Sequence, residues 1–157
     1  KQYFRQEMAR AKRYHKPFSI IMMDVDDFKT YNDSFGHATG DRLLELMGEL
    51  ILQTIRSVDV AFRYGGEEFI VLLPETRLEQ AILAAERLRD SVQQGTAQRP
   101  VEGANRGVTV SIGVASYPDN ADKMDELFNI VDSLLYLAKR RGKNKVYHQE
   151  SLQIPKK

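Results

Sequence analysis

Hydrophobic residues follow two patterns along the chain: they recur every three to four positions in some segments and form short, nearly continuous runs in others. The first pattern places apolar side chains on one face of a helix, and the second is typical of a buried strand. Strands are expected over residues 18–25, 59–64, 68–73, 108–115 and 145–148, and helices over the segment before Pro17, residues 41–57, residues 76–94 and the segment before Gly142.

Local signals set the expected ends of several elements. Pro17 ends the first helix because it has no backbone N–H to donate. The dipeptide Gly65-Gly66 is suited to the positive φ of a tight hairpin between the second and third strands. Thr76 and Glu79 have the spacing of a capping box, which predicts the start of the next helix.

The order of the elements predicts the fold class. Strand, helix, hairpin, helix and strand form the split βαββαβ arrangement, to which this chain adds a C-terminal helix and strand. We expect a ferredoxin-related α/β (α+β) fold with a mostly antiparallel sheet and helices packed on one face. In this topology the first and third strands are central and antiparallel, so the hairpin turn lies close to the end of the first strand.

The composition indicates one globular domain. The chain has 157 residues, and its 23 Lys and Arg against 22 Asp and Glu leave a formal net charge of +1. This balance gives no general reason to bind a long polyanion, so no DNA binding is expected. The absence of Cys excludes disulfide scaffolds, thiolate zinc sites and Cys nucleophiles, so any metal must bind oxygen or imidazole.

The chain shows no sign of a membrane span or a signal peptide. Its longest apolar run, residues 18–23, is far shorter than the ~18 residues that a spanning helix needs. We therefore expect a cytoplasmic domain, even if the parent protein is anchored in a membrane. The first residues resemble the inside of a helix without its cap, which suggests a fragment of a longer protein. Residues 151–157 are expected to form a disordered tail.

Acidic residues dominate the end of the first strand, where Asp24, Asp26 and Asp27 follow one another closely. The predicted topology brings Asp24 beside Glu67. Two carboxylates held together repel each other unless a cation lies between them. Carboxylates combined with water and phosphate oxygens suit Mg²⁺ or Mn²⁺ better than zinc.

The acidic segment has two other interpretations. Acid clustering alone is equally typical of a solvated strand end. The segment also begins like a calcium-binding EF-hand loop, but that loop requires Gly at its sixth position and Glu at its twelfth. Lys29 and Phe35 occupy these positions, so the calcium interpretation fails.

Three motifs occur in order along the chain. They are Asp24-Val-Asp-Asp-Phe-Lys-Thr-Tyr-Asn-Asp-Ser-Phe-Gly-His-Ala-Thr-Gly-Asp41, Arg63-Tyr-Gly-Gly-Glu-Glu-Phe69 and Ser111-Ile-Gly-Val-Ala115. Together they resemble the GGDEF diguanylate cyclases, and the match is spread over most of the chain. The resemblance implies a single domain of this family over residues 1–157, with a palm-like core and a regulatory sensor domain elsewhere in the parent protein.

The resemblance also implies an activity, because the family makes cyclic di-GMP from two GTP with release of two pyrophosphates. Asp24 and Glu67 would hold Mg²⁺ or Mn²⁺, two ions per half-site, with the Val25 carbonyl as a further ligand and Glu68 as a supporting one. The ions would draw the attacking 3′-hydroxyl and the α-phosphate together. Because the product is two-fold symmetric, two chains are expected to face each other as a homodimer.

The triphosphate has its own expected binding groups. The main chain around Asp27, Phe28 and Lys29 would turn N–H groups toward the phosphates, as a helix N-terminus does. Lys139 and Lys143 are four residues apart and would share a helix face if the helix extends that far. The family usually has Arg in place of Lys143, and Lys cannot form a bidentate fork, so weaker or less oriented binding is expected. A basic helix end that complements its own dipole is the alternative.

Guanine recognition is implied at Asn32 and Asp41, which match the donors of the Watson–Crick edge of guanine. Adenine would present an unprotonated N1 to Asp41, so that acceptor would face acceptor. The alternative for Asp41 is a helix N-cap. His37 receives no chemical role.

An inhibitory product site is implied by Arg56-Ser-Val-Asp59, which ends shortly before Gly65 as the Arg-x-x-Asp motif of the family does. The motif alone is weak, since composition predicts about one such match and Arg87-Leu-Arg-Asp90 is another. Ungapped carry-over adds Arg87 as a second inhibitory arginine. An exposed salt bridge is the alternative.

Two other functions compete with synthesis of cyclic di-GMP. The domain can be a catalytically weak or inactive receptor for cyclic di-GMP or GTP, although a receptor would not need both Asp24 and Glu67. A palm-like cyclase that uses ATP or mixed substrates is disfavoured by Asp41.

Overall fold

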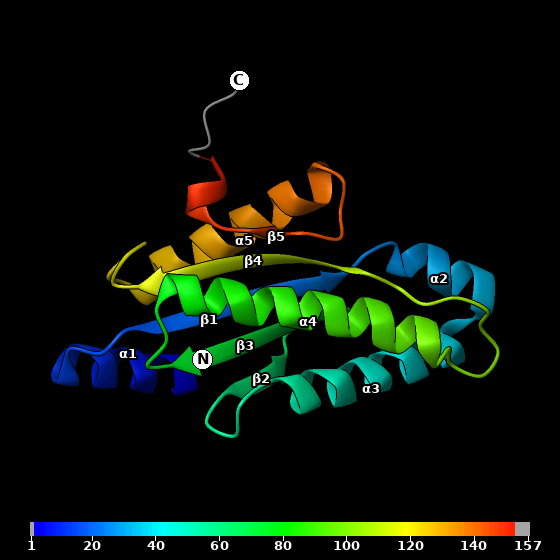
Figure 1. Ribbon diagram of the computed structural model, residues 1–157, viewed down its shortest axis with the longest axis horizontal. Coiled ribbons are helices and arrows are strands. Elements are labelled where there is room, and N and C mark those ends of the chain that lie inside the picture. Colours follow the sequence, from blue (N-terminus) through cyan, green and yellow to red (C-terminus); the bar gives the residue numbers. More distant parts are fainter. Residues whose placement is uncertain (1, 153–157) are drawn as a thin grey trace.

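The computed structural model describes residues 2–152, which form a five-stranded sheet with helices packed against it (Figure 1). The strands are β1 (Phe18–Val25), β2 (Val60–Arg63), β3 (Glu68–Pro74), β4 (Val110–Tyr117) and β5 (Val146–Tyr147). The helices are α1 (Gln2–Tyr14), α2 (Phe28–Phe35), α3 (His37–Thr54), α4 (Leu78–Gln98) and α5 (Met124–Arg140), followed by the 3₁₀ helix η1 (Gln149–Leu152). The predicted tail thus begins inside η1, and its remaining residues, 153–157, lie outside the described residues.

The sheet has the strand order β2-β3-β1-β4-β5, with β1 in the centre. β1 pairs antiparallel with both β3 and β4, and only the short β5 pairs parallel, with β4. The predicted mostly antiparallel sheet is confirmed. The register places Asp24 opposite Glu68 on one side and opposite Ser111 on the other, so the acidic end of β1 is flanked by both neighbouring strands.

Helices cover both faces of the sheet (Figure 1). Ile21 and Met23 of β1 pack in one cluster with α3 and α4, whereas Ile20 and Met22 pack in a second cluster with α1 and α5. The expectation of helices on one face was wrong. Every residue of β1 is buried, and a strand that is apolar on both sides needs a covering layer on each.

Helix α2 was not predicted, and α3 begins four residues earlier than the apolar pattern indicated, at His37. The segment that forms α2 is rich in Asn, Asp and Ser, which compete with helix formation through their side chains. Phe28, Tyr31 and Phe35 nevertheless recur at helical spacing, and Tyr31 is fully buried. This spacing is the signal that could have revealed α2.

The turn between β2 and β3 differs from the prediction in its backbone. Neither Gly65 nor Gly66 adopts a positive φ. The guanidinium of Arg63 closes the turn instead by donating to the Gly66 carbonyl at 2.8 Å, and the Tyr64 N–H donates to the Glu68 carbonyl at 2.9 Å. The predicted hairpin is therefore present but does not depend on glycine conformations.

The predicted capping box at the start of α4 does not form. Arg77 is the N-cap residue, and no side chain caps the helix. The Thr76 hydroxyl instead donates to the Pro74 carbonyl at 2.9 Å and accepts a hydrogen bond from the Arg56 guanidinium at 2.8 Å. The Thr76 hydroxyl is thus engaged by Arg56 and Pro74 rather than by the N–H groups of α4. The local sequence pattern gives no sign of the contact with Arg56.

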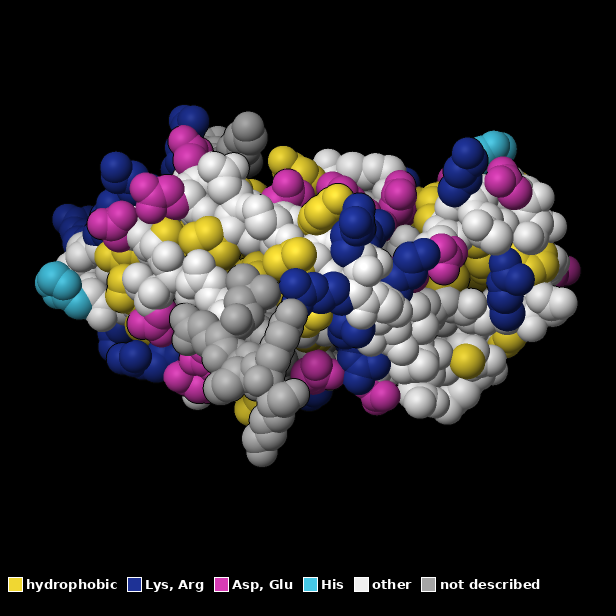
Figure 2. All heavy atoms as spheres, turned by 90° about the horizontal axis from the view of Figure 1, so that it is seen from above, with side chains coloured by type: hydrophobic (Ala, Val, Ile, Leu, Met, Phe, Trp, Pro, Cys, Tyr) yellow, Lys and Arg dark blue, Asp and Glu magenta, His cyan; other side chains and the backbone are white. Residues whose placement is uncertain are grey.

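The face that lies uppermost in Figure 1 carries charges of both signs. Lysine and arginine side chains are interspersed there with aspartate and glutamate side chains (Figure 2). Within the part of the chain that the structure describes, no helix has both the length and the apolar character needed to cross a membrane.

The contact between β4 and α5 predicts the effect of one substitution. A Cβ on Gly113 would lie 2.4 Å from the Val131 carbonyl oxygen and 2.8 Å from the Leu135 nitrogen, both of them backbone atoms. We expect Gly113→Ala to lower the free energy of unfolding by about 3 kcal/mol, because α5 must move away from the sheet. Urea denaturation followed by circular dichroism measures this loss.

Gly48→Ala is the matched control. A Cβ on Gly48, inside α3, would meet no atom within 4 Å. Alanine should therefore raise the free energy of unfolding by up to about 1 kcal/mol through its higher helix propensity. Equal stability of the two variants would contradict the close packing of β4 under α5.

Candidate active site

Acidic side chains from two separate segments meet at the end of β1. Asp24 is only 6% exposed and is the cross-strand partner of Glu68. The Val25 N–H donates to the Glu67 carbonyl at 3.2 Å, which holds the β2–β3 turn against β1. The structure therefore brings Glu67 and Glu68 to the end of β1, where Asp24 and Val25 lie, and the approach of Glu67 to Asp24 is the one that the topology predicted.

The ionisation of Asp24 is strongly affected by this setting. Burial raises the pKa of Asp24 to about 6, Lys139 opposes this rise, and the charges of Glu67 and Glu68 add to it. The Lys139 ammonium lies 2.7 Å from Oδ1 of Asp24. One lysine thus offsets only part of the cost of gathering these carboxylates.

The oxygens at this site fit a hard divalent cation that takes some of its ligands from elsewhere. Across residues 2–152, no three acidic or histidine side chains converge as a ready metal site. Asp24 and Glu67 would therefore need the Val25 carbonyl and oxygens of water or substrate to complete the coordination. An all-oxygen donor set favours Mg²⁺ or Mn²⁺.

Asp26, the middle carboxylate of the motif, is buried and fully engaged. The hydroxyls of Thr109 and Ser111 donate to it at 2.7 Å and 2.6 Å, and the Asn144 N–H donates at 2.9 Å. Its own N–H donates to the Thr109 carbonyl at 2.9 Å. Asp26 therefore joins the end of β1 to β4 and to the turn after α5.

The start of α2 lies immediately beyond these acids. Asp27, the N-cap residue, adopts φ 56°, and no side chain caps the helix. The first N–H groups of a helix have no acceptor inside it, so those around Asp27, Phe28 and Lys29 are available to an anion. Phe28 packs partly against the core and Lys29 is exposed, so this turn is anchored on one side and open on the other.

The two predicted phosphate-binding lysines do not share a helix face. α5 ends at Arg140, and Lys143 lies in the following turn with φ 61°. The turn nevertheless brings Lys143 to the same region, because its Nζ lies 2.5 Å from Oδ1 of Asp27. Each lysine is thus paired with a carboxylate, Lys139 with Asp24 at the end of β1 and Lys143 with Asp27 at the start of α2.

The predicted guanine-binding residues lie on the neighbouring helices α2 and α3. A Cβ on Gly40 would come within 1.8 Å of Oδ1 of Asn32, so glycine allows the Asn32 side chain to approach α3. This Oδ1 atom is buried and has no hydrogen-bond partner among the described residues. Asp41 is exposed and lies inside α3, whose N-cap is Gly36, so Asp41 is not an N-cap.

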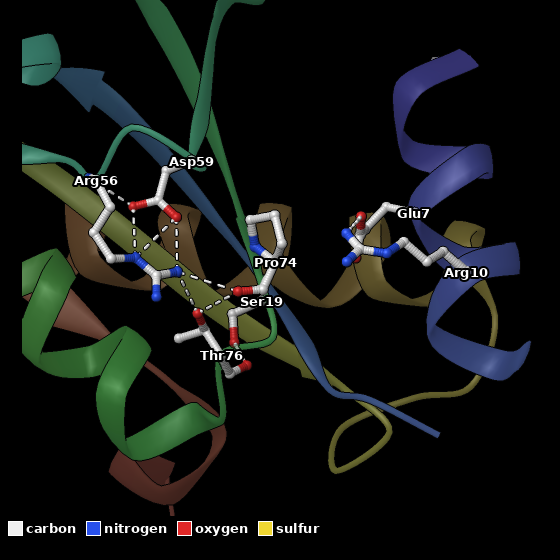
Figure 3. A network of polar contacts seen from close by, with 7 residues as sticks. All are labelled: Glu7, Arg10, Ser19, Arg56, Asp59, Pro74 and Thr76. Atoms are coloured by element: carbon white, nitrogen blue, oxygen red, sulfur yellow. Dashed lines mark hydrogen bonds and ion pairs between the residues drawn. The ribbon is translucent and has the colours of Figure 1, made fainter. Parts of the chain in front are cut away.

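The three residues of the predicted product site line one cavity of about 260 Å³. The Arg56 guanidinium forms an ion pair with Asp59 at 2.8 Å and also donates to the Pro74 carbonyl at 3.1 Å (Figure 3). Arg87 reaches the same cavity from α4. The salt bridge named as the alternative is thus present, and it forms part of a cavity wall.

A chain of hydrogen bonds connects this cavity to the start of β1, which is the end opposite the acidic residues. Thr76, which accepts from Arg56, offers its carbonyl to the Ser19 hydroxyl at 2.8 Å (Figure 3). The Ser19 and Ser116 hydroxyls are 2.6 Å apart. The central strand therefore contacts Thr76, which lines this cavity, near its start and carries the acidic cluster at its end.

A family model described as "Diguanylate cyclase, GGDEF domain" matches residues 1–145. The chain belongs to this family. The curated relatives include diguanylate cyclase DosC of Escherichia coli K12, 40% identical over 143 residues, which are 91% of this chain and 31% of DosC. Diguanylate cyclase A of Treponema denticola is 42% identical over 128 residues, covering 82% of this chain and 34% of that protein. The chain spans about a third of the length of these relatives.

Solved structures of GGDEF domains share the fold. The active GGEEF domain of a diguanylate cyclase from Vibrio cholerae matches with a TM-score of 0.84 at 36% identity, over 94% of this chain and 92% of that chain. The GGDEF domain of DgcB from Caulobacter crescentus, solved with c-di-GMP, matches with a TM-score of 0.84 at 28% identity, over 95% of this chain and 87% of that one.

Some residues that support this GGDEF site are not among those predicted from the sequence. Arg63 holds the Gly66 carbonyl, and Asp26 joins segments through Thr109 and Asn144. The partners of Asp26 are 83 to 118 residues away in sequence. No local pattern signals such pairs.

The raised pKa of Asp24 predicts a pH-dependent effect on stability. Its ordinary pKa of 3.8 rises to about 6 in the folded chain, so the folded chain holds this proton more tightly than the unfolded chain. Stability therefore falls as the pH rises between these values and stays reduced above pH 6. Asp24→Asn should raise the free energy of unfolding of the ligand-free domain at pH 7.5, by up to ~3 kcal/mol, with little effect near pH 3.5.

Thermal unfolding at both pH values measures this difference. The control is Asp27→Asn, which removes an exposed carboxylate paired with Lys143 and should change the free energy of unfolding by less than about 1 kcal/mol. A lower Tm for Asp24→Asn than for the unsubstituted domain at pH 7.5 would contradict a costly buried charge.

Proposed function

We propose that this GGDEF domain condenses two GTP into cyclic di-GMP and releases two pyrophosphates. The observation that carries the proposal is the buried carboxylate of Asp24, held beside Glu67 and Glu68 at the end of the central strand. Negative charge gathered at this buried strand end lowers the stability of the fold. Such a site is suited to bind a cation and, through the cation, a triphosphate. The names of the relatives, diguanylate cyclases among them, support the same activity.

Asp24, Glu67 and the Val25 carbonyl would hold Mg²⁺ or Mn²⁺, two ions per half-site, and Glu68 would support them. The ions would supply charge neutralisation at the triphosphate and favour attack of the 3′-hydroxyl on the α-phosphate. The turn from Arg63 to Glu68 is fixed by hydrogen bonds, so Glu67 is held in place before substrate arrives. Such preorganisation lowers the cost of assembling the charged site.

The phosphates would be held by main-chain N–H groups around Asp27, Phe28 and Lys29, and by the two lysines. Lys139 forms an ion pair with Asp24, and Lys143 forms one with Asp27. A triphosphate would offer these ammonium groups a second set of negative oxygens close by. The lysines would then bridge protein carboxylates and substrate, which places substrate binding and charge balance at the same residues.

Substrate choice would rest on Asn32 and Asp41. The Oδ1 atom of Asn32, which lacks a partner among the described residues, can accept a hydrogen bond from guanine. The exposed Asp41 carboxylate can accept from N1–H and N2–H₂ of guanine, whereas the unprotonated N1 of adenine would face it acceptor to acceptor. GTP is therefore the proposed substrate rather than ATP.

One chain would supply half of the reaction site. The product is two-fold symmetric, and each GTP must attack the other, so turnover needs two chains related by a two-fold axis. The proposed active form is therefore a homodimer. A regulatory sensor domain in the parent protein, which the family resemblance implies, would bring the two halves together.

Product inhibition is the proposed role of Arg56, Asp59 and Arg87. Guanidinium groups suit both the phosphates and the guanine faces of cyclic di-GMP. Arg56 is already fixed by Asp59, Thr76 and the Pro74 carbonyl, so its side chain needs little further ordering to bind a ligand. This cavity is also compatible with the second candidate function, a receptor that binds cyclic di-GMP without making it.

Incubation of the purified domain with GTP and Mg²⁺, followed by chromatography of the nucleotides, tests the proposed activity. We expect cyclic di-GMP and pyrophosphate. Glu67→Gln should reduce the rate about a thousandfold, which corresponds to roughly 4 kcal/mol of transition-state stabilisation, because it removes a metal-holding carboxylate. Binding of cyclic di-GMP by the same variant should be unchanged, since Glu67 does not line the product cavity.

The dependence of rate on protein concentration separates the proposed enzyme from a receptor. The rate per chain should rise with concentration until the homodimer saturates. Product binding without any synthesis, at concentrations where the chain is dimeric, would establish the receptor instead. Full turnover by Glu67→Gln would remove Glu67 from the mechanism.

Arg87→Ala is expected to relieve inhibition by product at least tenfold, measured as the cyclic di-GMP concentration that halves the initial rate. This position is preferred to Arg56, whose guanidinium also holds Thr76 and the Pro74 carbonyl. Arg99→Ala, at the end of the same helix and outside the cavity, is the control and should leave inhibition unchanged. Unaltered inhibition of Arg87→Ala would exclude this cavity as the inhibitory site.

A further inference from the structure

The turn between α5 and β5 has an uncommon backbone. Lys143 and Asn144 adopt φ values of 61° and 49°, although neither is glycine. L residues seldom occupy this region, and two in succession persist only where surrounding contacts hold them. The backbone of Lys143 and Asn144 is therefore held against its local preference by contacts with other parts of the fold.

Contacts from three directions hold this turn. The Lys143 N–H donates to the Ala138 carbonyl at 3.0 Å. The Asn144 N–H donates to Oδ2 of Asp26 at 2.9 Å, and Oδ1 of Asn144 accepts from the Arg89 guanidinium on α4 at 3.0 Å. The two contacts on Asn144 come from parts of the fold that are remote from α5 in sequence.

Asp26 is well placed to act as a fixed support. It is 5% exposed, and the hydroxyls of Thr109 and Ser111 donate to it from the β4 side. With three donors on its two oxygens, Asp26 has little capacity left for a substrate or a cation. Although Asp26 lies between Asp24 and Asp27 in the sequence, its contacts are all with other parts of the fold.

We propose that Asp26, assisted by Arg89, is a positioning residue for phosphate binding. Through Asn144 it holds the turn so that the Lys143 ammonium lies over the start of α2, 2.5 Å from Oδ1 of Asp27. The inference rests on the proposed function, because it assumes that the substrate triphosphate binds there. The fixed backbone and the ion pair with Asp27 already order this lysine in part, which lowers the conformational entropy that it loses when it binds phosphate.

The test compares binding of a non-reactive GTP analogue with binding of guanosine, both in the presence of Mg²⁺. Asp26→Ala removes the acceptor for Asn144 and should raise the Kd of the GTP analogue at least tenfold, while the Kd of guanosine, which has no phosphates, stays within twofold. Asp26→Asn should restore most of the affinity, because its amide oxygen can accept from Asn144 while its NH₂ group faces the Ser111 hydroxyl. Ser111→Ala, which removes another contact to Asp26, should leave both Kd values within twofold.

A double-mutant cycle shows whether Asp26 acts through Lys143. Adding Asp26→Ala to Lys143→Met should weaken binding of the GTP analogue less than twofold further, because the lysine that Asp26 positions is already absent. Full additivity, equal weakening of GTP analogue and guanosine, or unchanged affinity of Asp26→Ala would each overturn the inference. Failure of the unsubstituted domain to bind the analogue would overturn the proposed function first and this inference with it.

A variant at Arg89 provides an independent test of the proposal if Asp26→Ala does not fold. Arg89→Met removes the second contact on Asn144 without leaving a buried charge, and should raise the Kd of the GTP analogue about threefold with guanosine unchanged. Glu86→Gln is its control, since Glu86 pairs with Arg89 at 3.0 Å but does not touch the turn. Equal GTP-analogue affinity of Arg89→Met and Glu86→Gln would also count against the proposal.

Discussion

The structure depends on how negative charge is accommodated at the end of a buried strand. Asp24 lies on the central strand with strands on both sides, and Glu67 and Glu68 approach it from the next hairpin. Burial and the neighbouring acids raise the pKa of Asp24 to about 6, and the Lys139 ammonium offsets only part of the cost. The uncompensated negative charge at this site would be balanced by a divalent cation, which the proposed function supplies together with the substrate.

This arrangement is possible because helices cover both faces of the sheet. All eight residues of β1 are buried, so the strand is fixed by apolar packing on both faces and by hydrogen bonds on both edges. Its end can therefore hold groups that repel one another without moving apart. Its start is tied through Ser19 and Thr76 to Arg56, so the proposed product site and the proposed reaction site are attached to opposite ends of the same rigid strand.

The sequence allowed the sheet and the approach of Asp24 to Glu67 to be predicted, because both follow from apolar runs and from the order of the elements. It did not allow prediction of the layer on the second face, since the pattern of each helix shows that it is amphipathic but not which face of the sheet it covers. Helix α2 was missed because its polar composition outweighed three aromatic residues at helical spacing. The contacts of Asp26 and the loss of Thr76 as a cap depend on side chains brought together only by the complete fold.

Lys143 contacts Asp27 at the start of α2 and lies in the turn after α5. The family usually has an arginine there, whose planar guanidinium can grip a phosphate with two parallel hydrogen bonds and so orient itself. An ammonium is a point charge on a flexible stem, and its direction must come from elsewhere. In this chain the direction comes from a turn with two left-handed residues, held by Asp26 and Arg89, and from the carboxylate of Asp27. Under the proposed function, the backbone beneath Lys143 takes the orienting role that a guanidinium would otherwise have, and Asp26, the middle carboxylate of the acidic motif, supports that backbone.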